Sequence, residues 1–245
     1  MKCWAAILGG CEGPQSKEHY LTKGLMSGPT LKLTGLPFCR EGYWEVPLAG
    51  AASNILCKRH NELLSVADDE AIRLKEATQK AVRPLDLAKD AGLFRGPTTF
   101  SISGTLFSRW LCKTACNVLT VDKRTPPSDY IRHAFGQRTE SELFFYMAVR
   151  VGLQLRLRPD RVQMIDFSDE EGCLVFYVRF FGLHWLATNT DLKKSTDLEF
   201  GGFGKVPARE LMLRPKVMNV GGDLRHGLKF TKAVVQIDWS DSPSP

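Results

Sequence analysis

The stretch Cys57-Lys58-Arg59-His60-Asn61 lies immediately before a long amphipathic segment and determines how the first quarter of the chain is interpreted. Cys57 and His60, separated by two residues at the start of a helix, match zinc sites that take one ligand from a turn and the next from the first helical turn. Zinc requires two further ligands, and Gly9-Gly10 allows the sharp turn that directs Cys11 toward the metal. The sequence therefore predicts a zinc site formed by Cys3, Cys11, Cys57 and His60.

A second interpretation of these residues is that Cys3 and Cys11 are small core residues and His60 is an ordinary histidine at a helix start. Seven residues separate Cys3 from Cys11, which is a wider spacing than most zinc half-sites have. Cys39 is a weaker candidate, either as a fifth ligand or as a replacement for Cys3. Seven cysteines do not form a complete set of disulfide pairs, so the sequence predicts a reducing, cytoplasmic compartment.

Helical periodicity dominates the middle of the chain. Apolar residues recur at helical spacing over 62–82, where Ser65 is a candidate for capping or restarting the helix. A second amphipathic helix is predicted over 106–119, and a third over 141–149. Cys112 and Cys116 lie one helical turn apart, and core packing is the preferred interpretation for both.

Beyond Pro159 the composition changes to β-branched and aromatic runs, which are typical of strands. A Gly- and Pro-containing stretch over 92–97 marks the predicted domain boundary. The predicted fold class is α+β, with a zinc-stabilised module over 1–95 and a helix-plus-antiparallel-sheet domain over 99–245. Strands are predicted over 162–167, 173–181, 183–187, 206–213 and 228–239.

The pattern Ser16-Lys17-Glu18-His19, followed by the C-x-x-H pair and Asn61, resembles the ββα-metal core of HNH endonucleases. The resemblance covers about residues 1–80 and extends to uncharacterised bacterial and phage proteins of that superfamily. It implies a treble-clef-like zinc module and metal-dependent hydrolysis of phosphodiester bonds, most simply in DNA. A structural zinc ion and one catalytic Mg²⁺ or Mn²⁺ ion are the cofactors that it implies.

The resemblance also assigns roles to individual residues. His19 matches the general base that takes a proton from the attacking water, and a histidine suits this because its pKa lies near neutrality. Glu18 and Asn61 match the ligands of the catalytic cation. Asn54 is the candidate for the asparagine that orients the base, although it lies three residues before Cys57, and the family's register of about five residues places Ala52 there.

A degenerate, non-catalytic HNH-like module that binds nucleic acid or a protein is the alternative function, and a main activity in the second domain is a third. The net charge of +6 permits a polyanionic partner, and the composition excludes coiled-coil, collagen-like and disordered classes. No run of apolar residues is long enough to span a membrane. Whether the nucleic acid is DNA or RNA, and the oligomeric state, stay open at this stage.

Overall fold

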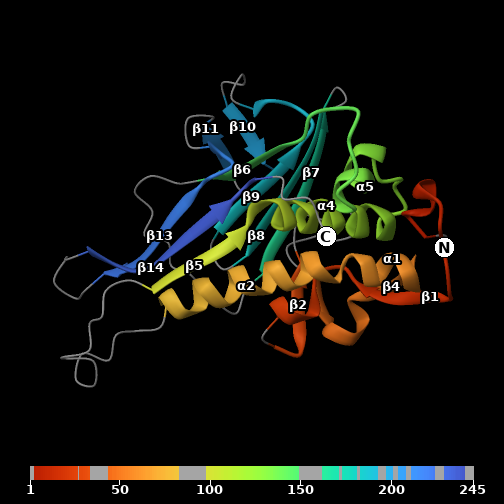
Figure 1. The fold of residues 1–245 in the computed structure, drawn as a ribbon, viewed down its shortest axis with the longest axis horizontal. Coiled ribbons are helices and arrows are strands. Elements are labelled where there is room, and N and C mark those ends of the chain that lie inside the picture. The colour runs from red at the N-terminus through yellow and green to blue at the C-terminus, as the bar shows by residue number, and fades with distance from the viewer. Residues whose placement is uncertain are drawn as a thin grey trace.

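The computed structural model describes a mixed α+β fold in which helices pack between several small sheets (Figure 1). This confirms the α+β class that the sequence predicts. The described residues are 3–26, 28–33, 44–82, 98–148, 162–170, 173–180, 183–192, 197–200, 204–207, 211–223 and 229–240.

The largest sheet is antiparallel and five-stranded, with the strand order β12-β6-β9-β8-β7. Its inner strands carry aromatic and β-branched residues on both faces, so one face packs on the helices and the other forms a smaller apolar cluster. The strands are β6 (Phe144–Ala148), β7 (Val162–Glu170), β8 (Cys173–Phe180), β9 (Leu183–Thr188) and β12 (Leu211–Leu213).

A second sheet, of three strands, joins β13 (Val217–Asp223), β14 (Lys229–Asp238) and β5 (Thr98–Ser103). β14 runs antiparallel to β13 but parallel to β5, so the second half of the chain is not purely antiparallel as predicted. Three two-stranded ladders complete the strands: β1 (Gln15–His19) with β4 (Ala52–Cys57), β2 (Thr30–Leu33) with β3 (Trp44–Pro47), and β10 (Asp197–Phe200) with β11 (Gly204–Pro207).

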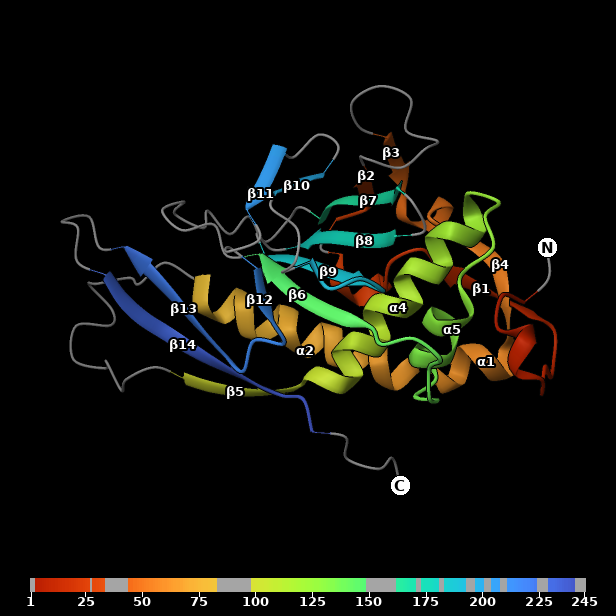
Figure 2. The same ribbon diagram turned by 90° about the horizontal axis from the view of Figure 1, so that it is seen from above.

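The helix α4 (Gly104–Val121) occupies the centre of the molecule, and its residues are buried over nearly the whole length. It packs against α2 (Ser65–Val82) and against the five-stranded sheet, where Phe107 meets the ring of Trp185 at 4.7 Å (Figure 2). The remaining helical elements are α1 (Lys58–Leu63), α5 (Ser128–Ala134) and the short 3₁₀ turns η1 (Ala6–Leu8), η2 (Lys23–Leu25) and η3 (Leu48–Gly50).

One hydrophobic core runs through both predicted domains. It begins at Cys3 and Trp4 beside the N-terminus, continues through α2 and α4, and reaches Ile237 on β14. The predicted boundary over 92–97 lies outside the described residues. The N-terminal module is therefore packed directly on the helix that supports the larger sheet.

Two predictions about secondary structure are wrong. Within the predicted segment 141–149, residues Phe144–Ala148 form strand β6 rather than a helix, because Phe145 and Met147 pack on the helices while Tyr146 faces the opposite cluster. Of the strand predicted over 206–213, the described residues belong to two strands, β11 and β12, which lie in different sheets. The predicted helix over 62–82 is interrupted at Leu64, and the Ser65 hydroxyl donates a hydrogen bond to the Glu62 carbonyl at this junction.

None of the described helices has the length and apolar character that a membrane-spanning helix requires.

Candidate metal centre

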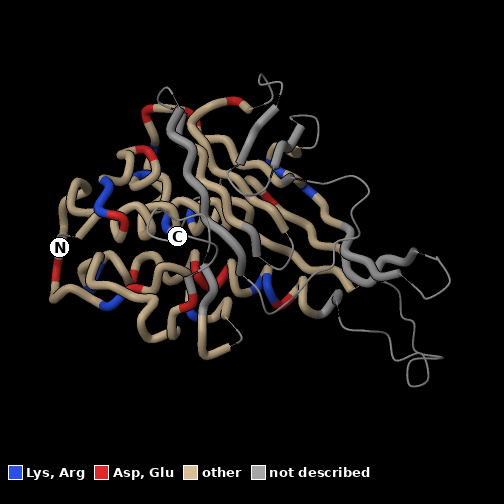
Figure 3. The backbone as a smooth tube through the Cα atoms, turned by 180° about the vertical axis from the view of Figure 1, so that it is seen from behind, with Lys and Arg blue, Asp and Glu red and all other residues tan. Residues whose placement is uncertain are grey.

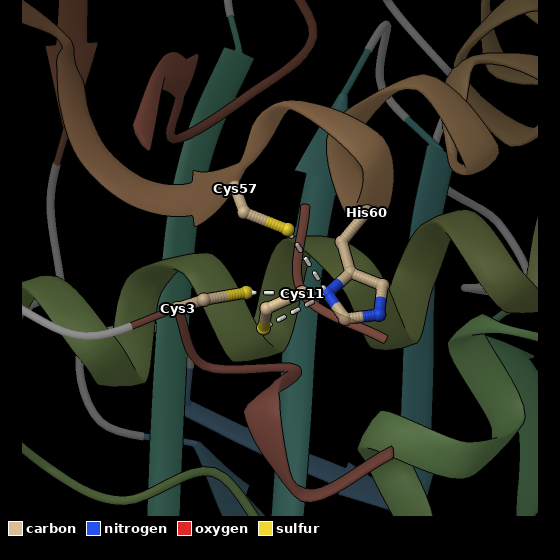
Figure 4. A group of neighbouring side chains, drawn as sticks. All are labelled: Cys3, Cys11, Cys57 and His60. Carbon is tan, nitrogen blue, oxygen red and sulfur yellow. Dashed lines mark hydrogen bonds between the residues drawn. The ribbon is translucent and has the colours of Figure 1, made fainter. Parts of the chain in front are cut away.

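The structure brings together the four side chains that the sequence predicts as zinc ligands (Figure 4). The His60 Nδ1 atom lies 3.4 Å from the Sγ of Cys3, 3.6 Å from that of Cys11 and 3.3 Å from that of Cys57. All four ligand atoms lie within 4.8 Å of one another. Three sulfur atoms and one imidazole nitrogen thus converge on a single point between the N-terminal loop and α1.

These distances match those of a tetrahedral zinc site. With Zn–S bonds of about 2.3 Å and a Zn–N bond of about 2.0–2.1 Å, sulfur and nitrogen ligands lie about 3.5–3.6 Å apart. The three observed nitrogen–sulfur distances, 3.3 to 3.6 Å, bracket that value. A Cys₃His set is also a standard donor set for structural zinc. The residues present therefore fit a structural zinc ion.

Local backbone geometry explains how residues from two separate segments meet. Cys57 is the last residue of β4 and precedes α1, so His60 lies on the first helical turn, three residues later. Gln15 of β1 pairs with Cys57, which places the loop containing Cys11 beside this helix start. Gly9 and Gly10 adopt positive φ angles of 74° and 64°, a backbone region that favours glycine, and they turn the chain toward the site.

Backbone N–H groups surround the sulfur atoms. Burial raises the pKa of the Cys57 thiol, but hydrogen bonds from the N–H groups of His60 and Glu12 and from the thiols of Cys11 and Cys3 together lower it below its usual value. Burial raises the pKa of Cys3, against backbone hydrogen bonds from Cys57 and Ala5. Burial and the neighbouring Cys3 raise the pKa of Cys11 to about 11. Without a metal, Cys11 is therefore a protonated thiol at neutral pH.

The His60 imidazole is held in the orientation that a metal ligand needs. Burial lowers its pKa, and the positive charge of Arg59 lowers it further, so the ring is neutral near pH 7. The ring also makes a hydrogen bond to the backbone of Gly9 and an edge contact with Phe135 at 5.2 Å. Such outer contacts fix the orientation of metal-binding histidines.

We expect zinc affinity to rise with pH across the neutral range, because zinc must displace the protons of thiols whose pKa is raised. Each proton released per zinc makes the affinity change by about tenfold per pH unit. Competition with a chromophoric chelator at pH 6.5, 7.5 and 8.5 measures this slope, those pH values being about one unit apart. An affinity that does not change with pH would contradict this set of ligands.

The predicted catalytic residue Glu18 lies in a buried charged cluster instead of facing solvent. Glu18 is only 7% exposed. Its carboxylate forms an ion pair with the Lys113 ammonium group at 2.8 Å and accepts a hydrogen bond from the Asn117 amide at 3.4 Å. Burial raises the pKa of Glu18, while Lys113 acts in the opposite direction. The Asn117 amide also accepts a hydrogen bond from the indole of Trp4, at 2.9 Å.

Lys113, only 1% exposed, is the centre of this cluster, and sequence reasoning missed it. Its ammonium group also pairs with Asp68 of α2 at 2.6 Å. Thr22 donates a hydrogen bond to Asp68 and accepts one from the indole of Trp110. The available signal was a lone lysine within the apolar run Trp110-Leu111-Cys112-Lys113-Thr114-Ala115-Cys116.

His19 ends strand β1, and the ladder register defines its neighbours. It pairs with Ala52, whereas Asn54 pairs with Lys17 two residues away. Because residues two apart on a strand share a face, His19 and Asn54 lie on one face of the β1–β4 ladder and Glu18 lies on the other. The Nδ1 atom of His19 is buried and has no hydrogen-bond partner among the described residues.

Asn61 follows His60 within α1 and is half-buried. In the part of the chain that the structure describes, no second group of three or more histidine, cysteine or carboxylate ligand atoms gathers as the zinc ligands do. Cys112 and Cys116 are fully buried in α4, as the core interpretation predicts, and Cys39 lies outside the described residues. No protein-family model, curated protein or solved structure matches the chain.

Proposed function

We propose that residues 3–82 form a zinc-stabilised HNH-like module, of treble-clef-like arrangement, that binds nucleic acid without hydrolysing it. The proposal rests on one observation: two pairs of ligand side chains, Cys3 with Cys11 and Cys57 with His60, lie together beside the β1–β4 ladder and α1. Bound zinc would supply fixed geometry here, holding the N-terminal loop, the end of β4 and the first turn of α1 together.

Two observations favour a binding role over a catalytic one. Lys113 and Asn117 occupy the carboxylate of Glu18, which is the predicted ligand of a catalytic cation. Ala52 stands opposite His19 in the ladder, and the side chain of an alanine has no oxygen with which to orient an imidazole. The unpartnered Nδ1 of His19 is consistent with this substitution. Under this proposal Glu18 serves the packing of β1 on α4 rather than the binding of a cation.

The net charge of the chain permits a nucleic-acid partner. The chain carries a net charge of +6, and Figure 3 shows its described Lys and Arg positions interspersed with Asp and Glu along several elements. Lys17 is exposed on the face of the β1–β4 ladder that also presents Asn54, an exposed amide. Lysine and asparagine side chains are common donors to phosphate oxygens. We therefore place the phosphate contacts on this face.

A metal-dependent endonuclease is the second candidate, because the same unpartnered Nδ1 belongs to a half-buried histidine at a strand end. In that case His19 would accept the proton of the attacking water, with Glu18, Asn61 and Asn54 in the roles that the HNH resemblance assigns them. Mg²⁺ or Mn²⁺ would supply charge stabilisation at the phosphate. This alternative requires Glu18 to exchange Lys113 for the cation.

The logarithm of the wild-type protein's affinity for nucleic acid is expected to fall linearly with the logarithm of the salt concentration. Lys17→Ala is expected to weaken binding and to reduce the slope by about one. Lys216→Ala, at an exposed lysine before β13, is the matched control and should leave the slope unchanged. Fluorescence anisotropy with labelled DNA and RNA duplexes and single strands gives all these values. Salt-independent binding, or no binding, would contradict the proposal.

The same samples test for cleavage, with Mg²⁺ or Mn²⁺ on plasmid and single-stranded DNA. We expect no hydrolysis by wild type or by His19→Ala. Cleavage by wild type that falls by about 10²- to 10⁴-fold in His19→Ala would establish the endonuclease instead, since that is the usual contribution of a general base.

A further inference from the structure

The four ligands of the metal centre differ in their access to solvent. Cys3, Cys57 and His60 are 9%, 4% and 4% exposed, whereas Cys11 is an exposed residue. Its thiol nevertheless reaches the other two sulfur atoms, with hydrogen-bond contacts to Cys3 and Cys57. Cys11 is therefore the ligand through which a solute can reach the centre.

The loop that carries Cys11 is attached to the start of α1. Gly9, Gly10 and Gly13 all have positive φ angles around it. Besides the thiol, the loop is held by the ion pair of Glu12 with the exposed Arg59 and by backbone hydrogen bonds from Arg59 and Lys58. The Glu12 N–H also donates to the Cys57 sulfur, and the backbone of Gly9 makes a hydrogen bond to the His60 ring. Glycines and a solvent-exposed ion pair allow the loop to shift without disturbing the core.

We propose that Cys11 is an oxidation site through which a peroxide releases the metal, an inference that rests on the proposed zinc site. Susceptibility to oxidation follows thiolate character and exposure, and zinc coordination gives Cys11 the first while its position gives it the second. Fully buried Cys112 and Cys116, by contrast, have pKa values raised well above the ordinary range by burial.

The chemistry balances with hydrogen peroxide as the oxidant. The Cys11 sulfur attacks one peroxide oxygen, the O–O bond breaks, and the products are a sulfenic acid and, after one proton is taken up, a water molecule. The neighbouring sulfur of Cys3 or Cys57 then attacks the Cys11 sulfur, forming a disulfide and expelling hydroxide, which takes up a second proton. Two thiolates lose two electrons, the peroxide gains them, and zinc leaves because two of its ligands are joined.

Release of zinc would act on the contact between the module and the second half of the chain. His60 packs edge-on against Phe135, which follows α5, and Trp4 contacts the same ring at 5.9 Å. His60 is one of the four proposed ligands, and Trp4 directly follows the ligand Cys3 in the sequence. Oxidation at the exposed loop is thereby connected to the packing between the N-terminal segment and α5.

The test is treatment of the zinc-loaded full chain with hydrogen peroxide in the presence of a chromogenic zinc indicator. We expect release of the bound zinc and, in a peptide map, a disulfide that contains Cys11, with Cys112 and Cys116 still reduced. Cys11→His provides the control, because an exposed position accommodates an imidazole and Cys₂His₂ sites also bind zinc. This variant is expected to retain its zinc in peroxide.

The outcomes separate the two proposals. A full chain that contains no zinc before treatment would remove the zinc site and this inference together. A zinc-loaded wild type that keeps its metal in peroxide, or whose first oxidised residue is not Cys11, would overturn the inference and leave the zinc site intact. Equal rates of release from wild type and Cys11→His would likewise overturn it.

Discussion

The Cys57→Ala protein is expected to bind no zinc and to lose its cooperative fold. Cys57 ends β4, begins α1, and receives the backbone N–H groups of His60 and Glu12, so its removal breaks the site at its centre. Structural zinc contributes about 10–16 kcal/mol of apparent binding free energy. Because that is as large as the whole stability of a typical domain, about 5–15 kcal/mol, the variant should be largely unfolded at 25 °C.

Metal analysis and circular dichroism during chemical denaturation test this prediction. Cys116→Ala is the matched control, since it removes a buried sulfur that does not belong to the metal centre. The control should keep about one zinc per chain and lose only about 1 kcal/mol, the usual cost of a single substitution. A Cys57→Ala protein that unfolds at the same denaturant concentration as wild type would contradict a structural role for the metal.

Lys113→Met is expected to destabilise the protein by about 3–5 kcal/mol, the usual consequence of removing one partner from a buried ion pair. Its ammonium group lies between two carboxylates, Glu18 at 2.8 Å and Asp68 at 2.6 Å, and it is almost completely buried. Methionine has nearly the same shape, so packing is preserved while two negative charges lose their counter-ion. Urea denaturation of wild type and variant gives the difference.

A triple variant, Lys113→Met with Glu18→Gln and Asp68→Asn, separates charge from shape. Replacing a complete buried charged cluster by hydrophobic side chains of similar volume is often close to neutral for stability. Gln and Asn remove the two charges and keep acceptors for Asn117 and Thr22, so the triple variant should recover most of the loss. Recovery would also show that Glu18 serves the packing of β1 on α4. A single Lys113→Met variant as stable as wild type would mean that this cluster contributes nothing to the fold.

The zinc ligands are predictable from sequence because each pair is encoded locally. Cys57 and His60 lie at the start of a helix, and the glycines beside Cys11 indicate a turn. These signals lie between residues that are close in the sequence, so they can be recognised without the three-dimensional structure. The same holds for the amphipathic helix α4, whose apolar periodicity is read directly from 106–119.

The environment of Glu18 was not predictable in the same way. Its partner Lys113 is far away in the sequence and is brought to it only by the packing of α4 on β1. Strand β6 was mistaken for a helix because a short apolar run buried on both faces has no clear period. The pairing of His19 with Ala52 likewise depends on a strand register, which a single sequence does not specify.

X-ray absorption spectroscopy at the zinc edge of the purified full chain tests the central claim most directly. We predict about one zinc per chain, with three sulfur neighbours at about 2.3 Å and one nitrogen neighbour at about 2.0–2.1 Å. Cys11→His should change this shell to two sulfur and two nitrogen neighbours, which assigns the signal to the site. A chain that folds without zinc, or a zinc shell composed only of oxygen and nitrogen, would contradict the account.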